Sequence, residues 1–307
     1  RFRRIFFQRK LVTFGLIVLV LLVIVAIFAP IIAPHDPYLN DMKNVLKDPS
    51  SSYILGTDNL GRDTFSRLVY GARTALYVGF GTVIVSAVIG MLLGLLAGYL
   101  GGIVNGVIMR VMDALMGFPM LVLALLLAAV LGGGLQNVVI ALAIATLPGY
   151  VRLMCAETMS VKENEYIMAQ KAIGSKSIRT MARHILPNAF QPSLVLITTM
   201  LGNVILAEAA LSFIGIGIKA PGAAWGSMAA EGYRFLEMSE PSADDLYRFA
   251  GHIAAALAVT RLVLFSLAES GPAVAASVDR AGRGFADVTK FVRGTVDVRG
   301  HGSPLVL

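Results

Sequence analysis

The chain has 307 residues, of which 56% are hydrophobic and 15% are charged, and its mean hydropathy is +0.74. Soluble domains carry a charge on about a quarter of their residues, so this composition excludes a soluble domain and indicates a polytopic membrane protein. The net charge of +7 does not require nucleic acid, because membrane proteins keep lysine and arginine on the cytoplasmic side. A single cysteine, Cys155, excludes a disulfide framework within the chain.

Six apolar stretches are long enough to cross a bilayer as helices. They are residues 11–33, 75–100, 107–131, 138–155, 193–216 and 250–268. The first is too long for the core of a signal peptide and is expected to be a retained transmembrane helix. Basic residues without any acidic residue precede it, which places the N-terminus in the cytoplasm. Six spans return the C-terminus to the cytoplasm and leave the first connecting loop outside.

The first connecting loop ends in a polar, amphipathic segment before the second span. Thr57 or Asp58 is expected to start a short helical turn, and Asp63 is expected to cap an interfacial helix that leads into the second span. Asp58 and Arg62 are spaced i,i+4, as are Asp63 and Arg67, so each pair is expected to form a weak ion pair.

Glycine recurs at every fourth position of the second span and just beyond it, at Gly90, Gly94, Gly98 and Gly102. Such a stripe of small residues lets another helix approach closely. Packing against a helix of the same chain is the simpler expectation, and contact with a second subunit is the alternative.

Charged residues within the apolar stretches are few. Arg110 and Asp113 lie one helical turn apart and are expected to pair with each other. Glu208 lies deeper, in the fifth stretch, where a charge is costly and usually faces a bundle interior or a water-filled path. Two roles are open for Glu208: lining a translocation path, or a local hydrogen-bonded structural role.

Motifs for catalysis are absent from the sequence. The segment AIGSKS differs from a phosphate-binding P-loop, because Ser175 separates Gly174 from Lys176 and the earlier glycine is replaced by Ala169. No H-E-x-x-H or G-x-S-x-G motif occurs, and the histidines do not have metal-ligand spacing. The sequence therefore predicts a non-catalytic chain without a metal site or cofactor, which draws any energy for transport from a partner.

A basic segment, AQKAIGSKSIRTMARHILPNAF, separates the fourth and fifth apolar stretches. Residues 165–173 are expected to continue the fourth span as helix, and Gly174 to form a turn. Ser175 or Ser177 is expected to cap a second helix, which Pro187 ends. The second helix is apolar on one face and cationic on the other, which suits either the groove of a partner protein or lipid headgroups.

Three stretches of the sequence are similar to a known family. EYIMAQKAIGSKSIRTMARHILPNAFQPSLV resembles the EAA loop of permease subunits of bacterial ABC importers. LGTDNLGRDTFSRLVYGARTAL resembles the opening of the permease domain in dipeptide and oligopeptide importers, and AEAALSFIGIGIKAPGAAWGSMAAEG resembles the fifth helix and following loop of that subfamily. The C-type subunits of dipeptide permeases are the nearest branch. These stretches cover most of residues 1–235.

The resemblance implies an all-α transmembrane domain of a type I ABC importer, in which the EAA loop forms coupling helices docked on a cytoplasmic ATPase. The coupling residues that it implies are Glu165, Tyr166, Ala169, Ala172, Gly174, Ser175, Arg179, Leu186 and Pro187. The sequence departs from the motif at its glutamate, which is Met168, at its second alanine, which is Gln170, and at its isoleucine, which is His184. These departures put an ion pair of that glutamate in doubt and leave the helix–glycine–helix–proline pattern intact.

The resemblance also implies partners and a location. The partners are a homologous second permease subunit, two ATPase subunits that bind ATP and Mg²⁺, an extracytoplasmic solute-binding protein and the lipid bilayer; no nucleic acid is expected. The location is the bacterial inner membrane, and the solute is a dipeptide or oligopeptide. Nickel and glutathione importers share these features, and a membrane scaffold that binds anionic lipid is the alternative from a different functional class.

Three regions divide the chain. Residues 1–74 hold the first helix and the external loop, residues 75–268 form the permease core with the coupling loop 164–190, and residues 269–307 form an unassigned tail. The resemblance weakens after about Phe235. The sixth apolar stretch has Arg261 near its centre, so either this arginine faces the pore or a partner, or this end departs from a native permease end.

Overall fold

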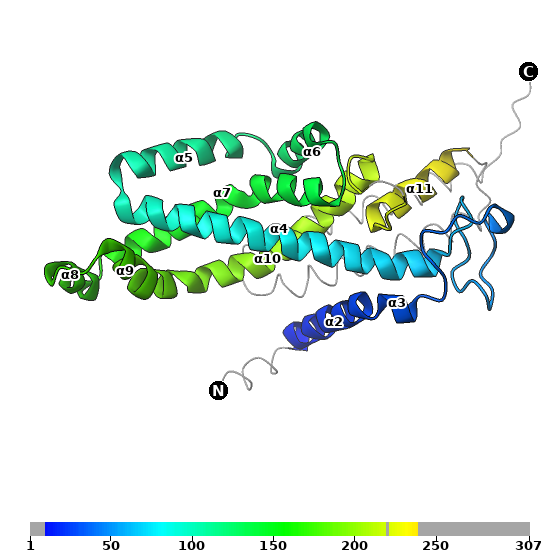
Figure 1. Ribbon diagram of the computed structural model, residues 1–307, viewed down its shortest axis with the longest axis horizontal. Helices are drawn as coiled ribbons and strands as arrows, with labels where there is room; N and C mark the ends of the chain where they lie inside the picture. Colours follow the sequence, from blue (N-terminus) through cyan, green and yellow to red (C-terminus); the bar gives the residue numbers. More distant parts are fainter. Residues whose placement is uncertain (1–9, 219–220, 239–307) are drawn as a thin grey trace, which may run out of the picture.

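The structure is a computed structural model that describes residues 10–218 and 221–238. These residues fold as helices joined by loops, and the only β-type pairing among them is an isolated bridge between Thr57 and Asp63 (Figure 1). The sixth predicted span, residues 250–268 with Arg261, and the tail, residues 269–307, lie outside the described residues. The helices are α2 (Lys10–Ile27), α3 (Ala29–Ile32), η1 (Met42–Asn44), α4 (Thr64–Leu100), α5 (Gly102–Met116), α6 (Met120–Leu131), α7 (Leu135–Lys162), α8 (Glu165–Ala172), α9 (Ser177–Thr180), η2 (Met181–Ile185), α10 (Leu186–Ile214) and α11 (Trp225–Met238).

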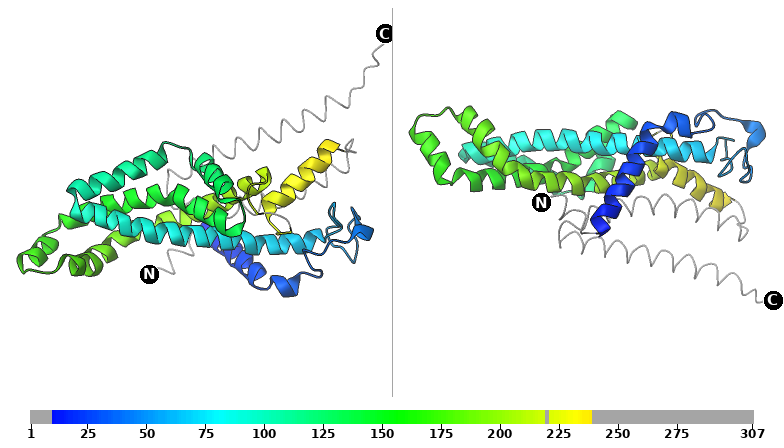
Figure 2. Two further views of the ribbon diagram at one scale, coloured as in Figure 1. Left: turned by 45° about the horizontal axis from the view of Figure 1, so that its top comes forward. Right: turned by 90° about the horizontal axis from the view of Figure 1, so that it is seen from below.

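Three long helical runs form the centre of the fold: α4, α7 and the run Ser177–Ile214, which joins α9, η2 and α10. Each is long and apolar enough to cross a membrane. Buried alanine, valine and leucine side chains from these helices form the main hydrophobic core, together with Leu22 of α2 and Trp225 of α11. Figure 2 shows α2 crossing the long helices obliquely.

The glycine stripe packs within the chain, as the simpler expectation had it. A Cβ atom at Gly90 would lie 2.5 Å from Cβ of Tyr150, and one at Gly98 would lie 2.7 Å from the carbonyl oxygen of Cys155, both on α7. Gly94 meets α7 in the same way. Gly102 does not belong to this contact, because it begins α5 and faces open space.

The third predicted span, residues 107–131, is not one straight helix. The structure divides it into α5 and α6, which meet at an angle of 91° (Figure 1). Pro119 lies at the break, where it supplies no N–H to α5 and disfavours the helical conformation of Phe118. The expectation of an uninterrupted span is therefore wrong, although the two helices together have the length and composition of one broken span.

Two other boundaries differ from the expectation. The interfacial helix and the second span are one continuous α4 of 37 residues, capped as predicted by Asp63, whose side chain accepts a hydrogen bond from the backbone N–H of Ser66. Pro187 does not end a helix, because it lies in the first turn of α10 directly after the π-helical turn η2. Proline is tolerated in the first turn of a helix, and a π turn rearranges the backbone hydrogen bonds just before it.

The long helices have two distinct ends. At one end Lys162 of α7 lies against the carbonyl oxygen of Tyr99 near the end of α4, and α8 and α9 project beyond both helices (Figure 1). At the other end Trp225 of α11 lies against Leu68 near the start of α4, beside the loop of residues 35–63. We call residues 164–190 the coupling segment and residues 35–63 the polar loop.

Candidate functional site

The coupling segment turns back on itself at Gly174. Helix α7 ends at Lys162, and α8 starts after a short break at Asn164, whose carbonyl oxygen accepts from the N–H of Ile167 at 2.9 Å. Gly174 follows α8 with a φ of 78°, a left-handed conformation that glycine adopts without strain. The predicted turn at Gly174 is confirmed, whereas the predicted unbroken continuation of the fourth span is wrong.

Two isoleucines anchor the coupling segment to the bundle. Ile167 of α8 and Ile185 of η2 are both 0% exposed, and they join a small hydrophobic cluster with Leu95, Tyr99 and Met154. These three partners come from the adjacent ends of α4 and α7. Burying a side chain of this size contributes about 1.5–3 kcal/mol, so both arms of the segment are held firmly.

Polar contacts add to this anchorage. Lys162 donates from Nζ to the carbonyl oxygen of Tyr99 at 2.7 Å, and it lies 5.7 Å from the centre of the Tyr99 ring. A lysine beside the last carbonyls of α4 is favourable for the helix dipole. Asn188 of α10 donates from Nδ2 to the hydroxyl of Tyr166 at 3.3 Å, which links the two arms.

The tip of the segment is apolar, exposed and surrounded by cations. Ile173 and Ile178 flank the turn at Gly174 and are 76% and 72% exposed. The side chains of Lys176 and Arg179 are exposed beside them. Isolated exposed apolar residues are common, but a pair at a projecting tip that contributes nothing to the core fits an interaction surface.

The structure places the predicted coupling residues on this projecting element. Glu165, Tyr166, Ala169, Ala172, Gly174, Arg179 and Pro187 are exposed, while Ser175 and Leu186 are partly buried. The predicted cap by Ser175 or Ser177 is wrong, because the residue before the first turn of α9 is Lys176 and no side chain caps it. The role of these residues in coupling stays a prediction.

Glu208 lies inside the bundle on α10 and is 1% exposed. The hydroxyl of Ser212 donates to Glu208 Oε1 at 2.7 Å and accepts from the N–H of Ile218 at 3.1 Å. This chain of hydrogen bonds ties the carboxyl group to the turn after α10, which fits the local structural role. A role of Glu208 in a translocation path stays a prediction.

The predicted pair of Arg110 with Asp113 does not form. Instead Arg152 of α7 donates a hydrogen bond to Asp113 of α5. The two side chains are 47% and 48% exposed, so this contact joins two helices at the surface and contributes little to stability. The helical spacing that suggested Arg110 ignores the neighbouring helix, which brings a second arginine within reach.

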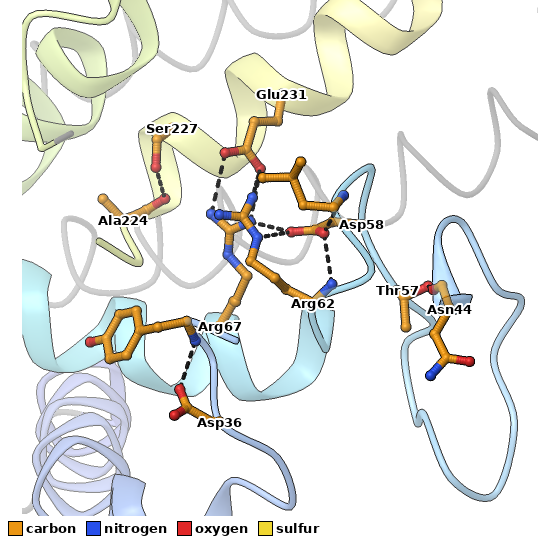
Figure 3. A network of polar contacts seen from close by, with 11 residues as sticks. Asp36, Asn44, Thr57, Asp58, Arg62, Arg67, Ala224, Ser227 and Glu231 are labelled. Carbon is orange, nitrogen blue, oxygen red and sulfur yellow. Dashed lines mark hydrogen bonds and ion pairs between the residues drawn. The ribbon is translucent and has the colours of Figure 1, made fainter. Parts of the chain in front are cut away.

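Four charged residues gather at the opposite end of the molecule. We call Asp58, Arg62, Arg67 and Glu231 the four-charge cluster (Figure 3). Arg62 donates to Asp58 at 2.7 Å and to Glu231 at 3.1 Å. Arg67 also bonds Asp58, and it holds both oxygens of Glu231 at 2.9 and 3.3 Å. Both arginine side chains are 1% exposed.

The cluster corrects two expectations for the polar loop. The Asp58–Arg62 pair is confirmed, but Arg67 pairs with Asp58 and Glu231 rather than with Asp63. The predicted helical turn at Asp58 is a single hydrogen-bonded turn that does not continue as a helix: the carbonyl oxygen of Asp58 accepts from the N–H of Gly61 at 3.0 Å. Its carboxylate accepts from the backbone N–H groups of Leu60 and Arg62. Burial alone would raise the pKa of Asp58, but these N–H groups and the charges of Arg67 and Arg62 outweigh it and hold the pKa below its ordinary value.

Sequence reasoning missed Glu231 and Trp225. Trp225 begins α11 and donates from Nε1 to the carbonyl oxygen of Leu68 at 3.0 Å. Both lie more than 150 positions from their partners on or beside α4, so no local spacing rule connects them. One signal was available: near the start of α4, arginine residues outnumber aspartate residues, which is compatible with a further carboxylate partner from a distant part of the chain.

Comparison with known proteins identifies the family to which this architecture belongs. Residues 90–269 match the family described as the binding-protein-dependent transport system inner membrane component. The chain belongs to this family. Residues 1–49 match the N-terminal transmembrane domain of oligopeptide transport permease C.

Similar curated proteins agree with this assignment. The chain is 41% identical to a dipeptide transport system permease protein of Alkalihalophilus pseudofirmus, over 75% of this chain and 76% of the relative. It is 37% identical to an oligopeptide transport system permease protein of Bacillus subtilis, over 74% of each chain. It is 42% identical to a glutathione transport system permease protein of Shigella dysenteriae, over 75% of each chain.

A solved structure agrees with the fold. A chain of the MetNI methionine ABC transporter, in inward-facing conformations, superposes with a TM-score of 0.50 over 68% of this chain and 96% of that chain. At 19% identity this likeness concerns the fold alone. The predicted family and the all-α transmembrane fold of a type I importer are confirmed, and the chain is a permease subunit, a multi-pass component of the inner membrane.

Proposed function

We propose that this permease forms half of the translocation path of an ATP-driven importer for dipeptides or oligopeptides, and that a homologous second permease subunit supplies the other half. Two cytoplasmic ATPase subunits bind the two permeases, one of them docked on the coupling segment of this chain. An extracytoplasmic solute-binding protein delivers the solute at the end with the polar loop. The observation that carries this proposal is the coupling segment itself. Its arms are anchored by Ile167 and Ile185, while its tip presents Ile173 and Ile178 to a partner.

The distribution of charge supports this orientation. The coupling segment has exposed Lys176, Arg179 and Arg183, as expected on the cytoplasmic side. The polar loop lies at the other end of α4 and has five acidic and three basic residues, so it lacks the excess of lysine and arginine that marks the cytoplasmic side. The proposed orientation has both termini of the permease in the cytoplasm, which the basic N-terminal segment and an even number of predicted spans support.

The continuity of the helices allows a movement of the coupling segment to reach the membrane-spanning part of the permease. The coupling segment passes into α10 within the single helical run Ser177–Ile214, so a displacement at α9 moves the whole run. ATP and Mg²⁺ belong to the ATPase subunits, since the sequence of this chain has no phosphate-binding loop and no metal-ligand motif. This chain contributes the path, its gating motion and the docking surface.

The names of the relatives support a peptide as the solute. Dipeptide and oligopeptide permeases are among the relatives with the greatest similarity, and each is matched over about three quarters of its length. Glutathione is the second candidate, because a glutathione permease is 42% identical and glutathione is itself a tripeptide. Nickel shares none of this chemistry and ranks below both.

Gly174→Asp tests the coupling surface. The side chain would project into space that no other atom of this chain occupies within 4 Å, and aspartate tolerates a left-handed conformation better than most residues. We expect the variant to insert normally, to lose the copurifying ATPases in mild detergent and to lose peptide uptake. The matched control is Gly132→Asp, because Gly132 has a φ of 90° and also faces open space, but lies between α6 and α7.

The same two measurements, ATPase copurification and peptide uptake, also distinguish a permease from a lipid-binding scaffold when they are made on the wild type. A wild-type chain that purifies without ATPases and supports no uptake would be a scaffold. Normal uptake by a well-expressed Gly174→Asp variant would show that the ATPases dock elsewhere.

A further inference from the structure

Helix α11 packs tightly on the end of α10. A Cβ atom at Gly226 would lie 2.0 Å from the carbonyl oxygen of Ala209, so the two backbones are in direct contact there. The rings of Phe213 and Tyr233 lie 6.0 Å apart and extend this contact along α11. Helices α10 and α11 therefore form one unit.

The attachment of α11 to α4 is made by side chains instead. The indole of Trp225 occupies the space left by Gly71, where a Cβ atom would lie 2.6 Å from the indole Cδ1, and its N–H bonds Leu68. Glu231, two turns further along α11, reaches Arg62 and Arg67 (Figure 3). Side-chain contacts of this kind separate without changing either helix.

Burial is uneven within the four-charge cluster. The arginine side chains are 1% exposed, Asp58 is 15% exposed and Glu231 is 27% exposed. Asp58 bonds both arginines independently of α11. If Glu231 withdraws, each guanidinium keeps a carboxylate partner, so the separated state avoids the large penalty of an unpaired buried charge. Glu231 is the member that leaves with the smallest penalty.

The α10–α11 unit also connects the two ends of the molecule. The run Ser177–Ile214 extends from the coupling segment to the turn before α11. Any tilt of this run relative to α4 must be accommodated where α11 meets α4, at Trp225 and Glu231. Two packed helices with two discrete arrangements are the kind of element that transmits a conformational change.

We propose that Glu231 is the releasable end of a latch that fastens the α10–α11 unit to α4 and the polar loop. In the closed state Glu231 bonds both arginines and Trp225 bonds Leu68. In the released state Asp58 retains the arginines and α11 lifts from α4. The place of this release in a transport cycle rests on the proposed function, whereas the latch itself rests on the contacts alone.

Hydrogen exchange of the purified full chain in lipid nanodiscs tests the latch. Glu231→Gln keeps the shape of the side chain and removes its charge. Loss of these charge-assisted hydrogen bonds should raise the population of the released state about 10- to 100-fold. The exchange rate of amides 228–234 should rise by the same factor, because these amides exchange from the released state. In the released state this 14-residue helix keeps its contact with α10 and loses its contacts with α4, so its local stability falls and its amides exchange faster. The buried amides of the α4–α7 contact should keep their rates.

Asp36→Asn is the matched control, because Asp36 is an exposed carboxylate of the same loop that accepts only from the N–H of Tyr38 among the described contacts. It should leave all rates unchanged. Trp225→Phe, which keeps an aromatic ring and loses the bond to Leu68, should accelerate the same α11 amides as Glu231→Gln.

Three results would overturn the latch. They are unchanged α11 rates in Glu231→Gln, equal acceleration in Asp36→Asn, and acceleration of the α4–α7 amides together with α11, which would assign the cluster to global stability. The proposed function fails by a different observation, namely the absence of ATPase binding and of uptake by the wild type, and neither changes the exchange result.

Discussion

Gly94 of α4 lies directly against the carbonyl oxygen of Val151 on α7, and a Cβ atom at Gly94 would be 2.5 Å from that oxygen. Cβ of Met154 and the N–H of Cys155 would also be within 3.0 Å. The neighbours are mostly backbone atoms, so they cannot move aside as a flexible side chain would. The central helix pair of the permease therefore depends on the absence of a side chain at this position.

Gly94→Ala should destabilise the chain by about 1–3 kcal/mol, as other substitutions that overfill a packed core do. In a chain of this size that lowers Tm by roughly 3–10 °C, measured by thermal unfolding of the purified protein in detergent. Gly149→Ala is the control, since Gly149 lies on α7 with nothing within 4 Å of a Cβ atom. It should leave Tm unchanged or raise it slightly, because alanine favours a helix more than glycine does. Equal Tm values for the two variants would contradict the close packing.

Ile178→Asp should weaken ATPase docking without affecting the fold. Ile178 is 72% exposed at the tip of the coupling segment, so its replacement removes no core contact. A charge introduced among the apolar contacts of an interface should lower the amount of ATPase that copurifies at least about tenfold. Ile54→Asp is the control, because Ile54 is 53% exposed on the polar loop at the other end of the molecule. Full recovery of ATPase with Ile178→Asp would exclude the tip from the docking surface.

Membrane orientation is tested by single cysteines in a Cys155→Ser background. Ser51 on the polar loop and Ser177 at the start of α9 are both exposed and lie at opposite ends of the bundle. We expect a membrane-impermeant maleimide to label position 51 in intact cells and position 177 only after the membrane is opened. Labelling of position 177 in intact cells would reverse the proposed orientation.

Some local signals in the sequence were informative. Asp63 as a cap and Gly174 as a turn each depend on the residue and its nearest neighbours, and both are confirmed. The apolar stretches predict the long helices because a run of apolar residues has few other stable arrangements in a membrane. Where a proline lies within or beside an apolar stretch, the sequence alone does not predict whether the helix is interrupted there, because the packing of the neighbouring helices decides it. Pro119 breaks a helix whereas Pro187 sits in the first turn of one, and the apolar pattern around the two does not distinguish them.

The four-charge cluster shows the limit of local reasoning. The i,i+4 rule found Asp58 for Arg62, but it also assigned Arg67 to Asp63, a residue whose Oδ2 instead accepts from the N–H and the hydroxyl of Ser66. Glu231 becomes a partner only because α10 and α11 return the chain to the start of α4. A contact of that kind is set by the packing of helices, and the spacing of residues does not contain it.

Acidification should weaken the four-charge cluster only well below neutral pH. The pKa of Asp58 is held below its ordinary value of 3.8, so its ionised form contributes stability above that value and loses it as the pH falls through the lowered pKa. Trp225 is the only tryptophan of the chain, and its emission reports directly on the contact with Leu68. Its emission maximum and its quenching by acrylamide should therefore stay constant from about pH 8 to about pH 5 and change only below about pH 4. Asp58→Asn should weaken the four-charge cluster already at neutral pH and lower Tm, because both buried arginines then share Glu231 alone. A transition of the wild type centred near neutral pH would show that a group other than Asp58 controls the pH dependence of this contact.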